Sequence, residues 1–440
     1  MSLGTETPLS GYTIFAKIGD DLVISQTEFV SFSFVIKMNE PPRGQLIILD
    51  RNGLGIHGNE SGTYITFEFN HVGDRMEEKS SSMMCIIDSV EQMNDNGENL
   101  SYRIEFTAGT VEILEKINAA YTGTSSNSLQ GVYNKFNAWW ADSFKFKQLN
   151  GSISMTDSMT WRCISMNMWD QMRYITSKSY RENDYLFWFW DDVNDAISVS
   201  TLLNAKSQPS TYVFLENNNA LGESDTVKLV KESPDATLWF FDKILRTGFV
   251  GKNKEALKPN TSVVVQDAKQ KKQVCGDVRG ECFEKTMDSM GNRSGNSIKH
   301  KPLSKAGPLA NLNVVRPNPN NTHAMYSMAD EIRARVMAGF GKRVTVTIYN
   351  NAGPPIGSRV ALICMNTKAP VGAEDILDKK YSDVYIVESK AIVYNALGQD
   401  RIGRIIPVSA KMTTTITLIT DNISEPGIDN VREVTETILK

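Results

Sequence analysis

The sequence has little of what an exported, metal-dependent or membrane-spanning protein needs. It contains only five cysteines and four histidines in 440 residues. An odd number of cysteines in a chain without an export signal predicts reduced thiols made in a cytoplasm. No apolar run approaches the ~18 to 20 residues that span a bilayer. Residues 1–11 have neither the basic nor the apolar region of a signal peptide. We therefore expect a soluble chain that is not Sec-exported.

The charges are nearly balanced, with 47 Lys+Arg against 51 Asp+Glu and a net charge of −4. Such a balance predicts no global attraction to nucleic acid or to an anionic membrane. Residues 251–305 differ, because they contain 12 Lys+Arg and 6 Asp+Glu, a local charge of 12 − 6 = +6. They lack the interleaved aromatic residues of a single-strand binding platform. A solvated, partly irregular insertion is the favoured interpretation, with a nucleic-acid patch as the alternative.

The first 110 residues alternate between apolar and polar residues, which is typical of strands with one buried face. Turn sequences rich in Gly, Pro, Asn and Asp separate these runs. The pattern predicts an antiparallel barrel or sandwich over 1–110. Its alternating apolar positions include Phe32, Phe34, Ile36 and Met38, then Ile65, Phe67 and Phe69, then Tyr102, Ile104 and Phe106.

A helical period follows, and it predicts an α+β middle domain over 111–205. Helices are expected at 111–120, from Ser125 or Ser126 onward, and at 158–178. The third carries a stripe of methionine and tryptophan, which we interpret as core rather than as a cofactor or peptide site. Its members are Met159, Trp161, Ile164, Met168, Trp169, Met172 and Ile175.

An aromatic run over 185–190 and an alternating run over 196–200 predict a β-hairpin packed on that third helix. Strand alternation places only one set of the aromatic run in the core, and we expect it to be the set that contains Trp188 and Trp190. The turn between the strands includes Asp191 and Asp192. It lacks the spacing of a calcium loop, so a solvated turn is predicted.

The rest of the chain predicts an insertion, a second strand-rich block and a short tail. The insertion, 246–340, includes the Pro/Asn-rich linker 315–321 and a helix at 326–340. Strands predicted within 341–425, joined by 206–245, form the second block, which is therefore discontinuous. An amphipathic tail helix is expected at 426–440. Two strand-rich blocks of similar size thus flank a helical middle.

No motif for chemistry is present: there is no P-loop, dinucleotide fingerprint, nucleophile elbow or HExxH zinc motif. Cys275 and Cys282 are the only close cysteine pair, and their spacing does not predict zinc. The carboxylate pairs Glu374/Asp375 and Asp191/Asp192 are neighbours on one segment and do not face each other across a cleft. His57, His71, His300 and His323 are expected in surface loops. No catalytic, cofactor-binding or metal-binding residue is assigned.

The order of these elements resembles the central baseplate hub of contractile-tailed bacteriophages, which is related to the hubs of type VI secretion spikes and contractile injection systems. The likeness lies in the strand-rich first block, the segment 119–126, the Met/Trp stripe, the hairpin over 185–200 and the strand around 380–387. It extends over most of the chain except 246–325.

The resemblance implies two tail-tube-like antiparallel β-barrels in one β-rich α+β chain, and a homotrimer of six barrels that adapts the six-fold tube to a three-fold spike. The implied partners are the tube protein, the spike, other baseplate proteins and DNA passing through the lumen. The implied location is the virion baseplate, after assembly in the host cytoplasm. Two alternatives stay open: a carbohydrate-binding adhesive tail protein, and a tail-associated cell-wall hydrolase.

Overall fold

A computed structural model describes 12–19, 22–25, 28–50, 63–72, 78–93, 100–115, 117–139, 145–148, 158–181, 184–192, 196–208, 212–216, 237–241, 244–249, 263–267, 272–276, 296–299, 313–316, 342–349, 352–364, 378, 380–399 and 405–420. Most of these residues lie in strands, and the helices among them are few and short. The predicted β-rich α+β class is confirmed. Within these ranges no helix has the length and apolar character required to cross a membrane.

The first block, here called the N-block, consists of seven strands in the order β3-β4-β7-β6-β5-β1-β2. Alternating apolar side chains put one face of each strand in the core, as the sequence predicts. The strands are β1 (Tyr12–Ile18), β2 (Leu22–Ile24), β3 (Phe29–Lys37), β4 (Glu40–Asp50), β5 (Tyr64–Val72), β6 (Glu78–Met93) and β7 (Leu100–Ala108).

The second block, here called the C-block, is assembled from strands on both sides of the insertion, in the order β16-β21-β24-β23-β22-β14-β15. The strands are β14 (Tyr212–Glu216), β15 (Thr237–Phe241), β16 (Ile244–Phe249), β21 (Lys342–Tyr349), β22 (Arg359–Ile363), β23 (Asp383–Gln399) and β24 (Ile405–Thr420).

The two blocks repeat one topology. If β3, β4, β5, β6 and β7 are matched to β16, β21, β22, β23 and β24, every neighbour relation and every antiparallel direction agrees. Even the β-bulges coincide, since β6 is bulged between Ile87 and Ser89 and β23 between Val387 and Ser389. β14 and β15 occupy the places of β1 and β2, although they pair in parallel.

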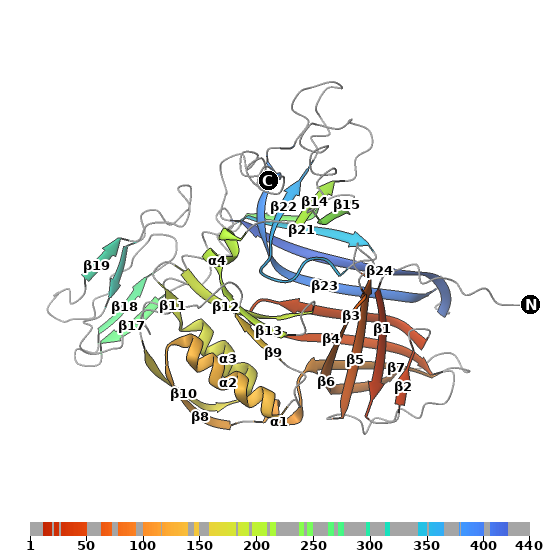
Figure 1. Ribbon diagram of the computed structural model, residues 1–440, viewed down its shortest axis with the longest axis horizontal. Coiled ribbons are helices and arrows are strands. Elements are labelled where there is room, and N and C mark those ends of the chain that lie inside the picture. Colours follow the sequence, from red (N-terminus) through yellow and green to blue (C-terminus); the bar gives the residue numbers. More distant parts are fainter. Residues whose placement is uncertain are drawn as a thin grey trace, which may run out of the picture.

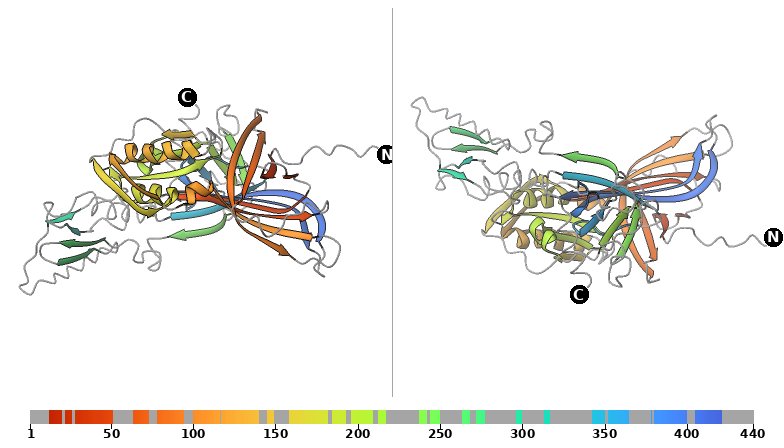
Figure 2. Two further views of the ribbon diagram at one scale, coloured as in Figure 1. Left: turned by 90° about the horizontal axis from the view of Figure 1, so that it is seen from below. Right: turned by 90° about the horizontal axis from the view of Figure 1, so that it is seen from above.

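Pairing of β3 with the part of β23 that extends beyond β22 joins the blocks into a single 14-stranded sheet. Figure 1 shows the long β23 and β24 lying along the N-block, and Figure 2 shows the joined sheet twisting and fanning open. The observed sheet is therefore continuous and mixed. Closure of each block into a separate antiparallel barrel remains a proposal.

The middle of the chain packs two helices between small sheets. β8 pairs with β10, and a second sheet has the order β11-β12-β13-β9. The elements are α1 (Val111–Leu114), β8 (Ile117–Gly123), α2 (Ser125–Trp139), β9 (Lys145–Gln148), β10 (Met159–Met166), α3 (Met168–Ser177), β11 (Tyr180–Arg181), β12 (Asp184–Asp191), β13 (Ala196–Thr201) and α4 (Leu202–Ser207).

Two helix predictions are wrong in part. The predicted helix at 158–178 is a strand up to Met166, and α3 begins only after Asn167, whose side chain accepts a hydrogen bond from the Asp170 amide at 2.8 Å. The predicted helix at 111–120 ends at Leu114, and β8 follows. The reason is pairing: β8 and β10 hydrogen-bond to each other and bury Tyr121 opposite Trp161 on one face.

Residues 246–249 of the predicted insertion belong to β16, and the rest of it is described only as two short hairpins. They are formed by β17 (Val263–Asp267) with β18 (Lys272–Gly276), and by β19 (Asn296–Lys299) with β20 (Asn313–Arg316). The predicted helix at 326–340, most of the linker 315–321 and the tail 426–440 lie outside the described residues.

A cluster of phenylalanine rings fills the N-block core. Phe32, Phe34, Phe67, Phe69 and Phe106 contact one another with centroids 4.4–6.3 Å apart. Such offset and tilted arrangements are the favoured geometries of aromatic pairs. The ring of Phe106 lies directly over Gly44 of β4, which a side chain there would prevent.

Gly44→Ala should therefore destabilise the fold. The added Cβ would lie 2.3 Å from the Phe106 ring and 2.4 Å from the Ser33 carbonyl oxygen, and a backbone oxygen cannot move aside cheaply. We expect a loss of about 1–3 kcal/mol in unfolding free energy, measured by urea denaturation. Arg43→Ala, on the exposed neighbouring residue, is the control; equal stability of the two variants would contradict the packing described.

Candidate functional site: the junction of the two blocks

The junction between the blocks is the pairing of β3 with β23. It runs antiparallel from Lys37 opposite Ser389 to Ser31 opposite Asn395. Phe34 and Ile392 face each other on the buried side of this pairing. The edge strand β3 of the N-block thus covers the part of β23 that extends beyond β22, which removes two open edges from the fold.

The β3–β4 turn extends the junction to the middle of the chain. Asn39, in the left-handed conformation with φ of 60°, donates its backbone N–H to the Trp188 carbonyl at 2.8 Å and accepts the Trp188 N–H on its side-chain oxygen at 3.1 Å. The Met38 N–H is bonded to the Glu388 carbonyl at 3.2 Å. Asparagine tolerates this conformation better than most residues. All three parts of the chain meet at this turn.

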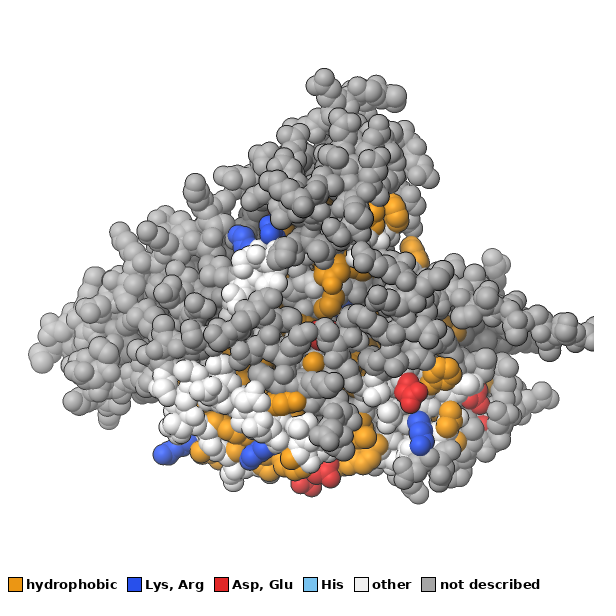
Figure 3. All heavy atoms as spheres, viewed as in Figure 1, with side chains coloured by type: hydrophobic (Ala, Val, Ile, Leu, Met, Phe, Trp, Pro, Cys, Tyr) orange, Lys and Arg blue, Asp and Glu red, His pale blue; other side chains and the backbone are white. Residues whose placement is uncertain are grey.

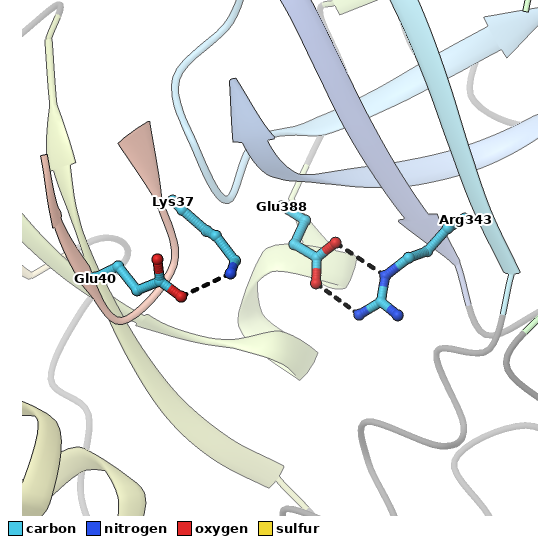
Figure 4. Close-up of polar contacts among 4 residues, drawn as sticks. All are labelled: Lys37, Glu40, Arg343 and Glu388. Atoms are coloured by element: carbon cyan, nitrogen blue, oxygen red, sulfur yellow. Dashed lines mark hydrogen bonds and ion pairs between the residues drawn. The ribbon is translucent and has the colours of Figure 1, made fainter. Parts of the chain in front are cut away.

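Two ion pairs flank this turn (Figure 4). Lys37 and Glu40 form an exposed pair at 2.6 Å across the turn. Arg343 of β21 holds both carboxylate oxygens of Glu388, at 2.7 and 3.0 Å. Glu388 is the extra residue of the β23 bulge, and a bulge re-aims a side chain. The bidentate geometry ties β21 to β23 across the intervening β24.

The aromatic strand β12 is buried on both faces, so the prediction of a single buried set is wrong. Trp188 stacks on Trp169 of α3 at 5.2 Å, and Trp190 meets Phe34 edge-on at 5.5 Å within the N-block core. Phe187 and Phe189 on the other face are also fully buried. The expected burial of both tryptophans is confirmed.

The second face of β12 is covered by the loop 352–358 of the C-block. The Gly357 N–H donates to the Val387 carbonyl at 2.9 Å, and the Val387 N–H donates to the Ser358 carbonyl at 3.0 Å. Gly357 has a φ of 78°, and a Cβ there would lie 3.0 Å from the Phe187 ring. The loop therefore lies so close to the rings that only glycine fits at this position.

The turn after β12 is buried, so the prediction of a solvated turn is wrong for Asp191 and Asp192. The Lys390 ammonium of β23 donates to both carboxylate oxygens of Asp192, at 2.5 and 2.6 Å. Burial raises the pKa of Asp192, and the Lys390 charge opposes that rise. Sequence reasoning missed this pair because its members are 198 residues apart, although a lysine on the apolar face of a strand was a usable signal.

A second buried pair lies in the C-block. Lys342 Nζ is 3.9 Å from Asp383 Oδ2 and 5.4 Å from the centre of the Tyr385 ring. Burial lowers the pKa of Lys342, and the Asp383 carboxylate partly offsets that effect. In both pairs, buried residues of opposite charge from different segments contact each other inside the fold.

The described residues of the junction make ion pairs and apolar contacts. Three cysteines whose side chains are described, Cys85, Cys163 and Cys364, are free thiols, and burial raises their pKa, for Cys163 to about 11, which keeps them protonated. Among the described residues no His/Cys/Asp/Glu cluster is suited to a metal. Cys282, Glu374, Asp375 and the histidine side chains lie outside those residues.

No protein-family model matches the sequence, and no curated protein matches it. A tail protein from Neisseria meningitidis has a similar solved structure, at 11% identity over 95% of this chain and 99% of that chain, with a TM-score of 0.45. The Escherichia coli c3393 protein, a type VI secretion component with structural similarity to T4 bacteriophage tail proteins gp27 and gp5, is 9% identical over 93% of this chain and 79% of that one, with a TM-score of 0.43.

The prophage tail protein gp18 from Listeria monocytogenes is 10% identical over 97% of this chain and 99% of that chain, with a TM-score of 0.38. Two of these structures are thus described as tail proteins and one as a type VI secretion component. Because these TM-scores are below 0.5, the proposed function is argued from the geometry of this chain.

Truncation of Trp190 to Ala should cost about 3–5 kcal/mol, because the indole fills space between β12 and the phenylalanine core of the N-block. Phe240→Ala, which truncates an aromatic side chain that is 48% exposed, is the matched control. Thermal and urea unfolding would measure both. An unchanged unfolding midpoint for Trp190→Ala would contradict the packing and favour a ligand-binding role for the aromatic strand.

Asp192→Asn should destabilise the fold by about 3–5 kcal/mol, because it leaves the Lys390 charge buried without its partner. The double variant Asp192→Leu/Lys390→Met should recover most of that loss, since an apolar pair needs no compensation. Glu40→Gln at the exposed pair should change stability by about 0.5 kcal/mol or less. A double variant as unstable as the single one would show that the pair is not coupled.

Proposed function

We propose that this chain is the structural hub of a contractile phage tail, a homotrimeric ring that adapts a six-fold tail tube to a three-fold spike. The observation that supports this most is the duplicated strand order of the N-block and the C-block. Three copies of a chain with two equivalent blocks present six similar units in a ring. Such a ring matches six-fold symmetry on one side while keeping three-fold symmetry on the other.

The proposed division of the chain follows from these blocks. Residues 1–110 form the first tube-like barrel, and residues 206–245 with 341–425 form the second, to which β16 adds the residues up to Phe249. Residues 111–205 form the middle domain, residues 246–340 the insertion and residues 426–440 the tail. The barrels close fully only in this proposal, because the described strands form one open sheet.

Exposed apolar side chains support an assembled state. Several of the large ones lie on the outermost strands of the 14-stranded sheet or on the strands next to them, and these outermost strands have an uncovered edge in the described part of the chain. Val23 lies on β2, Phe240 on β15 and Leu245 on β16, while Phe15 and Tyr349 lie on the neighbouring strands β1 and β21. Cyclic assembly covers such edges.

The adhesive alternative is disfavoured by where the tryptophans lie. A sugar-binding surface needs several exposed aromatic rings in one patch, but Trp161, Trp169, Trp188 and Trp190 are at most 4% exposed. Among the described side chains on the face drawn in Figure 3, both charge signs are present. These features fit a protein that works by packing against other proteins.

In this proposal the protein acts by assembly and not by turnover. The ring joins the tail tube above to the spike below, contacts other baseplate proteins and leaves a lumen for DNA. It is assembled in the host cytoplasm and remains in the virion baseplate. Permanent interfaces of this kind bury well over ~2,000 Å².

The trimer can be tested by light scattering on the purified chain. The expected mass is three times 49.1 kDa, and it should persist on dilution to micromolar concentration, because the free sheet ends are buried in the ring. A stable monomer at that concentration would count against the hub and for a monomeric adhesive protein.

The adaptor role can be tested with the tube protein from the same tail. Purified hub should nucleate tubes of uniform diameter that are capped at one end, and it should co-purify with a trimeric spike. Cell-wall hydrolysis by the hub alone should stay at background. Robust hydrolysis, or failure to cap tubes, would favour the hydrolase alternative.

A further inference from the structure

The duplicated topology identifies which strands are equivalent, residue by residue. Residues of β6 correspond to the residues of β23 whose numbers are 300 higher. Cys85 pairs with β5 as Tyr385 pairs with β22, and the bulge before Ser89 matches the bulge before Ser389. By the same matching of pairs, Arg43 of β4 corresponds to Arg343 of β21.

The matching also fixes β3 against β16. Val35 of β3 lies opposite Arg43, and Gly248 of β16 lies opposite Arg343. Gly248 is therefore the equivalent of Val35, and the neighbouring residues follow in step, so that Phe249 corresponds to Ile36.

The β3–β23 junction is made within the chain. The strands equivalent to its two partners, β16 and β6, both have an unpaired edge in the described part of the chain. Within the chain, β3 covers the edge of β23 at 389–395. Among the described residues, the equivalent edge of β6, 89–93, is paired on one side only, with β7. The equivalent of β3, β16, is likewise paired on one side only there, with β21. The described strands of each chain therefore include one open edge of each kind.

We propose, on the basis of the hub function above, that β16 of one copy pairs antiparallel with residues 89–93 of β6 in the next copy and so repeats the β3–β23 junction between chains. The register follows from the equivalence. Gly248 lies opposite Glu91, as Val35 lies opposite Ala391, and Phe249 lies opposite Val90, as Ile36 lies opposite Lys390. The interface is heterologous, and with the three-fold rotation of the proposed hub it closes into a ring that leaves neither edge unpaired.

The residues at these positions suit a contact between copies. Glu91, Ser89 and Gln92 are exposed, and the Glu91 carboxylate side chain is 63% exposed even though it is paired with Arg103. In the proposed register Arg246 lies opposite Met93, one diagonal step from Glu91, so opposite charges are brought together. Phe249 opposite Val90 is an apolar pair, and Leu245 of β16 is 52% exposed in the single chain.

Paired cysteines test this register directly. The variant Gly248→Cys/Glu91→Cys should form disulfides between copies on mild oxidation and run as a covalent trimer on a non-reducing gel. Val35→Cys/Ala391→Cys is the matched control, since the same pair geometry then links residues within one chain and should give only monomer. Gly248→Cys/Gln92→Cys, shifted by one residue to the opposite face of the sheet, should remain largely unlinked. Cys275→Ser and Cys282→Ser serve as the background.

A charge swap provides a second readout that does not depend on disulfide geometry. Arg246→Glu alone should weaken the trimer several-fold in dilution experiments, because it places two acids together. Arg246→Glu/Glu91→Arg/Arg103→Glu, which also reverses the pair between residues 91 and 103, should restore most of the trimer.

The outcomes separate this inference from the proposed function. A trimer by light scattering whose Gly248/Glu91 cysteines stay unlinked, or whose charge swap is not rescued, would overturn the β16–β6 contact and leave the hub role standing. A monomeric chain would overturn both.

Discussion

The register of β3 on β23 is the constraint on which the rest of this structure depends. It joins two seven-stranded blocks into one sheet, and it places the β3–β4 turn where Asn39 exchanges two hydrogen bonds with Trp188. Because side chains alternate along a strand, a slip of one residue would turn the buried face of β3 outward. The junction and the middle of the chain therefore depend on the same pairing.

The ion pairs stabilise this register by making the alternatives costly. Lys390 lies on the buried face of β23, so any other docking of the β12–β13 turn would leave its charge without Asp192. A buried pair adds little net stability compared with apolar residues but penalises wrong arrangements strongly. Arg343 and Glu388 act similarly across three strands of the C-block. Ion pairs that fix the strand register suit a protein that we propose holds a tube and a spike in alignment.

The sequence predicts an element correctly where a single buried face sets its apolar pattern. Alternation identified β3, β5 and β7, and composition identified the aromatic strand. The segment 158–178 was misassigned because Met159, Ile164, Met168 and Met172 recur at a near-helical spacing, although the first two belong to a strand paired with β8. Periodicity alone does not separate a strand that leads directly into a helix.

Long-range features were beyond reach for a different reason. Which residues fill the second face of β12, which strand accepts β3 and which lysine pairs with Asp192 all depend on contacts between segments about 150–350 residues apart in the sequence, for which a single sequence has no signal. The equal size of the two blocks was visible, but their identical strand order was not. That order supports the symmetry argument, and it appears only once the pairing is known.

Images of the purified protein by electron microscopy test the central claim most directly. Top views should show a three-fold ring with a central hole, in which six similar densities alternate between N-blocks and C-blocks. Single compact particles, or a two-fold dimer without a hole, would contradict the ring and with it the role of the duplicated blocks.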